Sequence, residues 1–298
     1  MSIEMVVRTL LLASAICVAG CGAKEKAPPA SAGKINVVAS FYPMYIMARN
    51  VMKGVPGVSL VNMTPNTSGC LHDYAITTND MKCLASADVF VTNGAGMESF
   101  LDKVAAQYPR LKVVQLAEGI PLIKGKGEEG DNPHVWVSIT HAITQVRNLG
   151  KTMGEFDPPH AELYRKNTDE YVARLDALSA KMRTALAPFR GQKIVTFHEA
   201  FPYFAQEFGL VIAAVIQREP GSAPSAKELA ETIDLIKGSG IKALFSEPQY
   251  PAAAADAIAR ETAAKVYVLD PAVTGPDDPD AYIKIMEKNL TVLKEALR

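Results

Sequence analysis

Three of the five histidines in this chain lie in loops or at strand ends, where a side chain can reach a ligand. His72 lies just before a helical stretch, His134 follows a Gly-rich loop, and His198 directly follows a β-rich run. Asp270 follows another such run in the same way. Imidazole nitrogens and a carboxylate oxygen suit Zn²⁺, and four protein ligands complete a tetrahedral shell. These residue types predict a four-coordinate metal site.

Each of these residues also has a simpler explanation. A histidine in a loop is often a cap or a surface residue, and Asp270 before a proline could start a turn. Glu247 also follows a strand and could be a ligand, a support for a ligand or a helix cap. His141 and His160 lie on predicted helix faces, so we interpret both as structural or solvent-exposed.

No short motif joins the candidate ligands, so the fold must assemble them. Short apolar runs that predict strands alternate with helical stretches, which indicates an α/β fold with parallel sheets buried on both faces. In such sheets ligands gather at the carboxyl ends of strands. The predicted strands are 35–40, 58–61, 89–93, 112–116, 193–197, 210–215, 243–245 and 265–269, and the helical stretches include 44–52, 78–87, 199–208, 227–238 and 253–262.

One segment is much longer than the rest. Asp157 and two prolines form a good helix start, and apolar residues then recur at helical spacing without a Gly or Pro until residue 188. We predict two doubly wound lobes, 34–156 and 191–298, joined by one long rigid helix within 157–190. The metal site would lie in the cleft, with His72 and His134 facing His198 and Asp270.

The N-terminus predicts export. A basic residue precedes a short apolar run that ends at Cys21, which suits a signal peptide better than a membrane span. The segment 18–21 resembles a bacterial lipobox, so we expect residues 1–20 to be cleaved and Cys21 to carry lipid. An ordinary secretory signal is the alternative. Residues 21–33 have no helical or strand period and are interpreted as a tether.

Composition narrows the function classes. The formal net charge of −1 argues against nucleic-acid binding, which needs a basic surface.

Once Cys17 leaves with the signal peptide and Cys21 is lipidated, Cys70 and Cys83 are the remaining cysteines. An oxidising environment outside the cytoplasm permits a disulfide between them. Two free thiols, or Cys70 as a metal ligand, are the alternatives.

At these residues the chain resembles the solute-binding lipoproteins of zinc and manganese ABC importers, the cluster A-I (cluster 9) family. The resemblance covers essentially the whole mature chain. The segments that carry it are Val38–Met44, His72–Tyr74 with Asp80 and Ala87–Val89, Asn93–Glu98, Asn132–Trp136, His198–Phe204, Glu247–Tyr250 and Leu269–Pro271.

The resemblance implies a function and a ligand set. His72, His134 and His198 match the positions that ligate the ion, and Asp270 matches the fourth, carboxylate position. It implies two α/β lobes bridged by one helix, and a monomeric protein that is not an enzyme. The protein would hold a divalent transition metal ion outside the cytoplasm and deliver it to an ABC permease with its ATPase.

The identity of the ion stays open. The loop 124–130 has acidic residues but lacks the histidines that zinc-dedicated members often carry, and Cys70 and Leu71 differ from many members. His198 is retained where manganese-type members often have a carboxylate. Three nitrogen donors favour zinc over manganese, with iron third. A secreted zinc hydrolase, with Glu247 or Glu199 as base, is the rival class, and a surface-adhesin role could coexist with metal capture.

Overall fold

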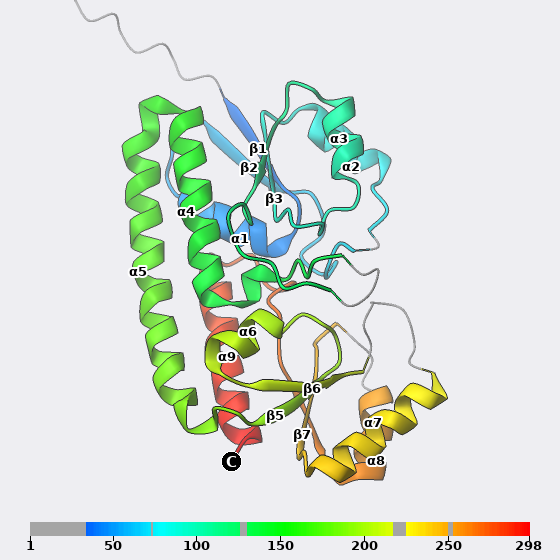
Figure 1. Cartoon of the computed structure of the whole chain (residues 1–298). Coiled ribbons are helices and arrows are strands. Elements are labelled where there is room, and N and C mark those ends of the chain that lie inside the picture. The colour runs from blue at the N-terminus through cyan, green and yellow to red at the C-terminus, as the bar shows by residue number, and fades with distance from the viewer. Residues whose placement is uncertain (1–33, 73, 126–129, 217–224, 250–252) are drawn as a thin grey trace, which may run out of the picture. The chain divides into compact units, whose positions relative to one another are not determined.

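The computed structural model describes residues 34–72, 74–125, 130–216, 225–249 and 253–298, and these contain two four-stranded parallel sheets (Figure 1). The first sheet has the order β2-β1-β3-β4 and the second the order β6-β5-β7-β8, so the same strand order occurs twice. The strands are β1 Ile35–Ala39, β2 Val58–Asn62, β3 Val89–Thr92, β4 Lys112–Gln115, β5 Lys193–Thr196, β6 Val211–Val215, β7 Ala243–Ser246 and β8 Lys265–Val268.

The burial of the inner strands explains why short apolar runs predict parallel sheets that are covered on both faces. Every residue of β3 and of β7 is buried, as expected for strands covered on both faces. The edge strands β2 and β8 are only partly buried. All eight predicted strands are present, with ends that differ by a few residues at most. The α/β prediction is confirmed.

Helices connect successive parallel strands. Two of them begin with a reciprocal capping box, Thr77 with Asp80 and Ser225 with Glu228. The helices are α1 Tyr42–Val51, α2 Thr78–Ala85, α3 Leu101–Gln107, α4 Ile139–Phe156, α5 Ala161–Leu186, α6 Pro202–Phe208, α7 Ala226–Ser239, α8 Ala253–Thr262 and α9 Ala281–Ala296. Short 3₁₀ turns lie at η1 Val135–Val137, η2 Pro158–His160 and η3 Ala187–Phe189. Helices α3 and α9 were not among the stretches named from the sequence.

The long helix predicted within 157–190 is α5, which has 26 residues. It packs on α1 and α4 beside the first sheet and on α6 and α9 beside the second (Figure 1). Residues 33–298 therefore form one compact unit that contains both sheets. This arrangement confirms two α/β lobes joined by one long helix, while the lobe boundaries at 156 and 191 stay predictions.

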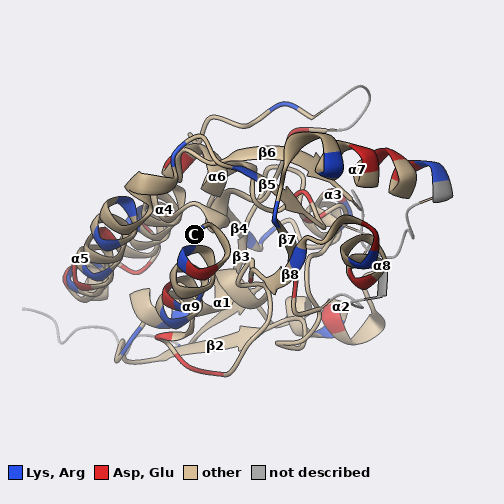
Figure 2. Cartoon of the chain, turned by 90° about the horizontal axis from the view of Figure 1, so that it is seen from below, with Lys and Arg blue, Asp and Glu red and all other residues tan. Residues whose placement is uncertain are grey.

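Charged side chains lie mainly on the helices. Figure 2 shows residues of both signs along α5, α7 and α8. On α5, exposed Arg165 pairs with Glu162 one turn before it and with Asp169 one turn after it. Such exposed pairs contribute little stability, so α5 is held chiefly by its buried apolar face.

Residues 1–33 lie outside the described residues, and with them the predicted signal peptide, the lipidation site Cys21 and the tether. Within the part of the chain that the structure describes, none of the helices combines the length and apolar character needed to cross a bilayer.

The contact between α4 and α5 depends on Gly150. A Cβ atom there would lie 2.0 Å from Thr168 Oγ1 on α5. We expect Gly150→Ala to lower the free energy of unfolding by about 1–3 kcal/mol, because Thr168 must move in a close-packed contact. Gly154→Ala is the matched control, since its Cβ would meet Ala161 at an ordinary 3.6 Å. That variant should gain up to about 1 kcal/mol of helix propensity. Urea unfolding measures both, and equal stability of the two variants would contradict this packing argument.

Candidate metal site

Four side chains converge at one point of the fold. Cys70, His72, His134 and His198 each offer one ligand atom, and these atoms lie within 4.8 Å of one another. The Nε2 atoms of His72 and His134 are 3.0 Å apart, and the ring centroids of His134 and His198 are 4.7 Å apart. Three of the four ligands predicted from the sequence are thus brought together. Among the described residues, Cys70 joins this group and Asp270 does not.

The carboxyl ends of the strands position the histidines. His72 lies in the connection between β2 and α2, and His134 follows β4 and directly precedes η1. His198 lies two residues after β5, in a turn. We expected a helix to begin at Glu199, but α6 begins at Pro202, which occupies its first turn. Both sheets therefore contribute histidines from the strand ends at which ligands bind in open parallel sheets.

Asn132 holds the imidazole of His134 in a fixed orientation. His134 is only 2% exposed, and its Nδ1 lies 3.0 Å from Asn132 Oδ1. Asn132 is itself anchored, because its side-chain amide donates to the Glu199 carbonyl and its own carbonyl accepts from the Tyr203 hydroxyl. A proton on Nδ1 donated to Asn132 leaves Nε2 with a lone pair for a metal ion. The sequence analysis missed this role of Asn132.

Glu247 supports His198 in a similar way. Its Oε2 lies 3.5 Å from His198 Nδ1, and both residues are 2% exposed. Gln249 donates a 2.6 Å hydrogen bond to the same oxygen, while Glu247 Oε1 is buried without a hydrogen-bond partner among the described residues. A carboxylate beside the outer nitrogen of a ligating histidine orients the ring and raises its basicity. Of the three roles considered for Glu247, this contact fits support of a ligand.

Asp270 lies two residues after β8 in a tightly held turn. Its backbone N–H donates to Asn289 Oδ1, and its Oδ1 accepts a 2.8 Å hydrogen bond from the N–H of Ala272. Burial raises the pKa of Asp270, the Ala272 N–H and Lys288 lower it, and nearby Glu247 raises it further. Asp270 therefore lies in the same region but outside the four-atom group, and it stays a predicted ligand.

The two remaining cysteines are free thiols, so the disulfide considered from the sequence is not formed. Cys70 lies with the three histidines, whereas Cys83 lies on α2 and is not part of that group. Burial and then the charge of Glu247 raise the pKa of Cys70. Both effects favour the neutral thiol.

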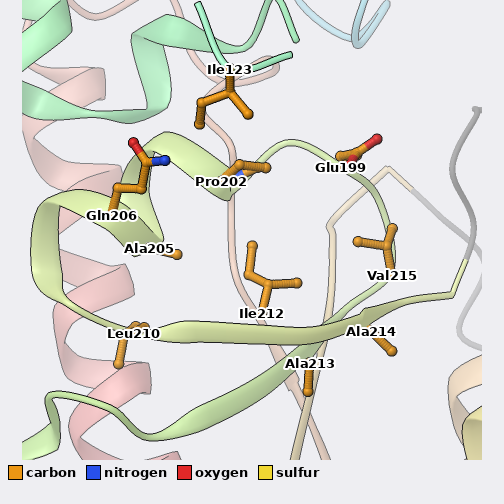
Figure 3. Close-up of a pocket in the computed structure, with 10 residues that line it drawn as sticks. All are labelled: Ile123, Glu199, Pro202, Ala205, Gln206, Leu210, Ile212, Ala213, Ala214 and Val215. Carbon is orange, nitrogen blue, oxygen red and sulfur yellow. The ribbon is translucent and has the colours of Figure 1, made fainter. Parts of the chain in front are cut away.

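Solvent reaches this site through a pocket of about 260 Å³. His72, His134, Asn132 and Glu199 line it together with the loop around Gly96. A second pocket of about 480 Å³ lies between the edge strand β6 and α6, and Figure 3 shows the residues that line it, which include the polar side chains of Glu199 and Gln206. That second lining contains none of the four converging residues. The pocket at the histidines is therefore the one with metal-ligating chemistry.

The other two histidines have contacts of a different kind. His141 on α4 is half-buried with its ring 5.3 Å from that of Tyr203, and His160 places Nδ1 2.8 Å from Asp157 Oδ2. Neither belongs to the converging group. These contacts agree with the structural interpretation made from the sequence.

Burial of His134 predicts a pH-dependent stability of the metal-free protein. Burial, and then the neighbouring His198 and His72, lower the pKa of His134 well below 6.5. Above about pH 6.5 the residue is neutral in the folded and unfolded states and contributes nothing. As pH falls below that value the unfolded chain takes up a proton that the folded chain refuses, so folding stability declines.

We expect the metal-stripped protein to lose about 1–2 kcal/mol between pH 6.5 and pH 5 through His134. Urea unfolding at both pH values measures this loss. His134→Gln cannot titrate and should show a flatter dependence. If parent and variant lost stability equally, His134 would not be the residue responsible.

The architecture and the converging histidines are typical of one kind of protein. Two parallel sheets bridged by one long helix, with histidines converging at their strand ends, are the features of a two-lobed metal-binding solute-binding protein. The chain belongs to the family described as ZnuA, zinc-uptake complex component A, periplasmic, whose model matches residues 37–296. The family assignment made from the sequence is confirmed.

Individual relatives agree with this assignment. The chain is 31% identical to the high-affinity zinc uptake system protein ZnuA of Bacillus subtilis, over 97% of this chain and 96% of that protein. Its structure resembles that of the solute-binding protein FpvC from Pseudomonas aeruginosa in complex with Mn²⁺, with a TM-score of 0.80, 29% identity, and coverage of 89% and 98%. It also resembles Zn(II)-bound AdcA from Streptococcus pneumoniae, with a TM-score of 0.78 and 28% identity over 89% of this chain and 58% of that one.

Proposed function

We propose that this protein is the extracytoplasmic binding component of an ABC importer, which captures a Zn²⁺ ion and delivers it to the permease and its ATPase. The observation that supports this most directly is the convergence of His72, His134 and His198 within 4.8 Å. The ion is the cargo, so the site must bind it tightly and also release it. The relatives named as zinc-uptake and zinc-binding proteins support the same conclusion.

The preference for zinc follows from the donors. Three imidazole nitrogens suit Zn²⁺, whereas Mn²⁺ is harder and prefers more oxygen. Manganese remains the alternative cargo, because FpvC is a relative that has been solved with Mn²⁺, and iron is the third.

The residues that orient the histidine rings prepare the site to capture a metal ion. Asn132 lies within hydrogen-bond distance of Nδ1 of His134, and Glu247 lies 3.5 Å from Nδ1 of His198, so both rings are oriented before the ion binds and less ordering is left to occur. The surrounding chain excludes water from these two rings, since both are 2% exposed. Half-buried His72 lines the pocket, and it provides the side from which an ion enters.

Location and assembly complete the proposal. Export through the predicted signal, lipid on Cys21 and the tether 21–33 would keep a monomer at the outer face of a bacterial membrane, close to the permease. The family description as a periplasmic component supports the extracytoplasmic location. Recovery of the protein in the membrane fraction, lost in Cys21→Ser, tests the anchor.

A binding role is favoured over the rival zinc hydrolase. A hydrolytic base must face the water on the metal. Glu247 instead lies against Nδ1 of His198, on the side of the ring away from a metal bound at Nε2. Glu199, the other base considered, lines the pocket at the histidines, so against it the family assignment is what supports binding without catalysis.

Isothermal titration of the metal-stripped protein with Zn²⁺ tests the proposal. We expect one tight equivalent, with Mn²⁺ displaced in competition. Absence of zinc binding by the parent protein would overturn the proposal, and turnover of ester or peptide substrates that depends on zinc would favour the hydrolase.

A further inference from the structure

Cys70 lies beside the three histidines of the candidate metal site. Its sulfur belongs to the group of ligand atoms that lie within 4.8 Å of one another, together with one nitrogen from each of the three histidines. The residue between Cys70 and His72 is Leu71, which is completely buried in the main core cluster. This anchor holds the segment so that the side chains on both of its flanks reach the same point.

The distances are compatible with one ion bound by all four residues. Zn–N bonds of about 2.0 Å and Zn–S bonds of about 2.3 Å place tetrahedral ligand atoms roughly 3.3–3.5 Å apart. The Nε2 atoms of His72 and His134 are already 3.0 Å apart, and no two ligand atoms of the group are more than 4.8 Å apart. Closing the site around the ion therefore requires side-chain movements of about 1 Å, which rotations of a thiol and an imidazole supply.

Asp270 is less well placed for this role. Its Oδ1 already accepts the N–H of Ala272, and its backbone is held by Asn289. None of its atoms joins the converging group within the described residues.

Resting on the proposed function, we propose that Cys70 is the fourth ligand, so that the cargo is bound by three nitrogens and one sulfur. When the ion binds, a metal–sulfur bond forms, the S–H bond breaks, and the proton leaves to solvent. Thiolate is a soft ligand that favours Zn²⁺, and also Co²⁺ and Cd²⁺, over Mn²⁺. Cys70 would therefore be the residue that makes the site selective for softer ions, in a chain whose loop 124–130 lacks histidines.

Cobalt reports the thiolate directly in the unaltered protein. We expect Co²⁺ bound to the metal-stripped parent to show a thiolate-to-cobalt charge-transfer band in the near ultraviolet and the visible bands of a tetrahedral ion. Cys70→Ser should lose the charge-transfer band. The matched control is Cys83→Ser, which removes the other described thiol and should keep the band unchanged.

Competition titrations measure the effect on selectivity. Cys70→Ser should lower the affinity for Zn²⁺ by about a hundredfold and that for Mn²⁺ by less than about tenfold, so the preference for zinc narrows. Asp270→Asn should leave the charge-transfer band in place. Circular dichroism checks that each variant is folded. The cobalt spectrum of the parent protein tests the thiolate ligand even if a variant fails to fold.

The outcomes separate the two proposals. A parent protein that binds zinc but shows no thiolate band with cobalt overturns the role of Cys70 and leaves the proposed function standing. Unchanged zinc affinity in Cys70→Ser does the same. A parent that binds neither ion overturns both proposals.

Discussion

Replacing His134 by alanine is expected to lower the affinity for Zn²⁺ by about a hundredfold. Zinc bound by four protein ligands is held by about 10–16 kcal/mol in small protein sites, which is roughly 3 kcal/mol for each ligand. A loss of that size corresponds to a factor of about 100 in the dissociation constant. His134 should reach this value because Asn132 has already fixed its ring, so little ordering cost is recovered when it is removed.

Competition against a chromophoric chelator measures this loss. His160→Ala is the matched control, because His160 pairs with Asp157 away from the four converging residues. We expect it to bind zinc as the parent does. Asn132→Ala should lie between the two, with a loss of roughly ten- to a hundredfold, because it removes the orientation of the ring but not the ligand. Equal affinities in His134→Ala and His160→Ala would mean that the cluster is not the zinc site.

The largest effect on folding is expected at Trp136. This side chain is completely buried, and its ring packs edge-on against Phe41 with centroids 5.2 Å apart. Its Nε1 donates a 2.8 Å hydrogen bond to the Pro271 carbonyl, and its own carbonyl accepts from the Tyr282 hydroxyl. Trp136 thus joins the segment after the first sheet to the segments after the second.

Trp136→Ala should lower the free energy of unfolding by about 3–5 kcal/mol, because it leaves a large cavity and an unpaired buried carbonyl. Trp136→Phe keeps most of the packing and loses the hydrogen bond, so a smaller loss of about 1–3 kcal/mol is expected. Phe156→Ala, at a side chain that is 39% exposed, is the control and should cost much less. Denaturant unfolding of the metal-stripped proteins measures the series. A Trp136→Ala variant as stable as Phe156→Ala would show that this residue does not join the two halves.

Much of the fold could be predicted from local patterns. Strands buried on both faces appear as short apolar runs. Helix α5 appears after Asp157 as apolar residues that recur at helical spacing without a Gly or Pro. Both signals depend only on residues close together in the chain. Helices α3 and α9 were not named from the sequence, and the packing of α9 against α5 is a contact between segments that lie far apart in the chain. The start of α6 was placed early because His198 and Glu199 form a turn before Pro202.

The class of fold, the family and the three histidines at strand ends could be predicted from the chain alone, because residue types, spacing and ordered motifs are local properties. Which side chains meet depends on how the chain folds in three dimensions. The tertiary structure placed Cys70 beside the histidines, left Asp270 in its turn with Ala272, and put Glu247 against His198. The physical reason is that a metal site of this kind has no local motif. Its ligands come from separate loops, and the packing of two sheets against one helix sets the few ångströms that decide whether a side chain can reach an ion.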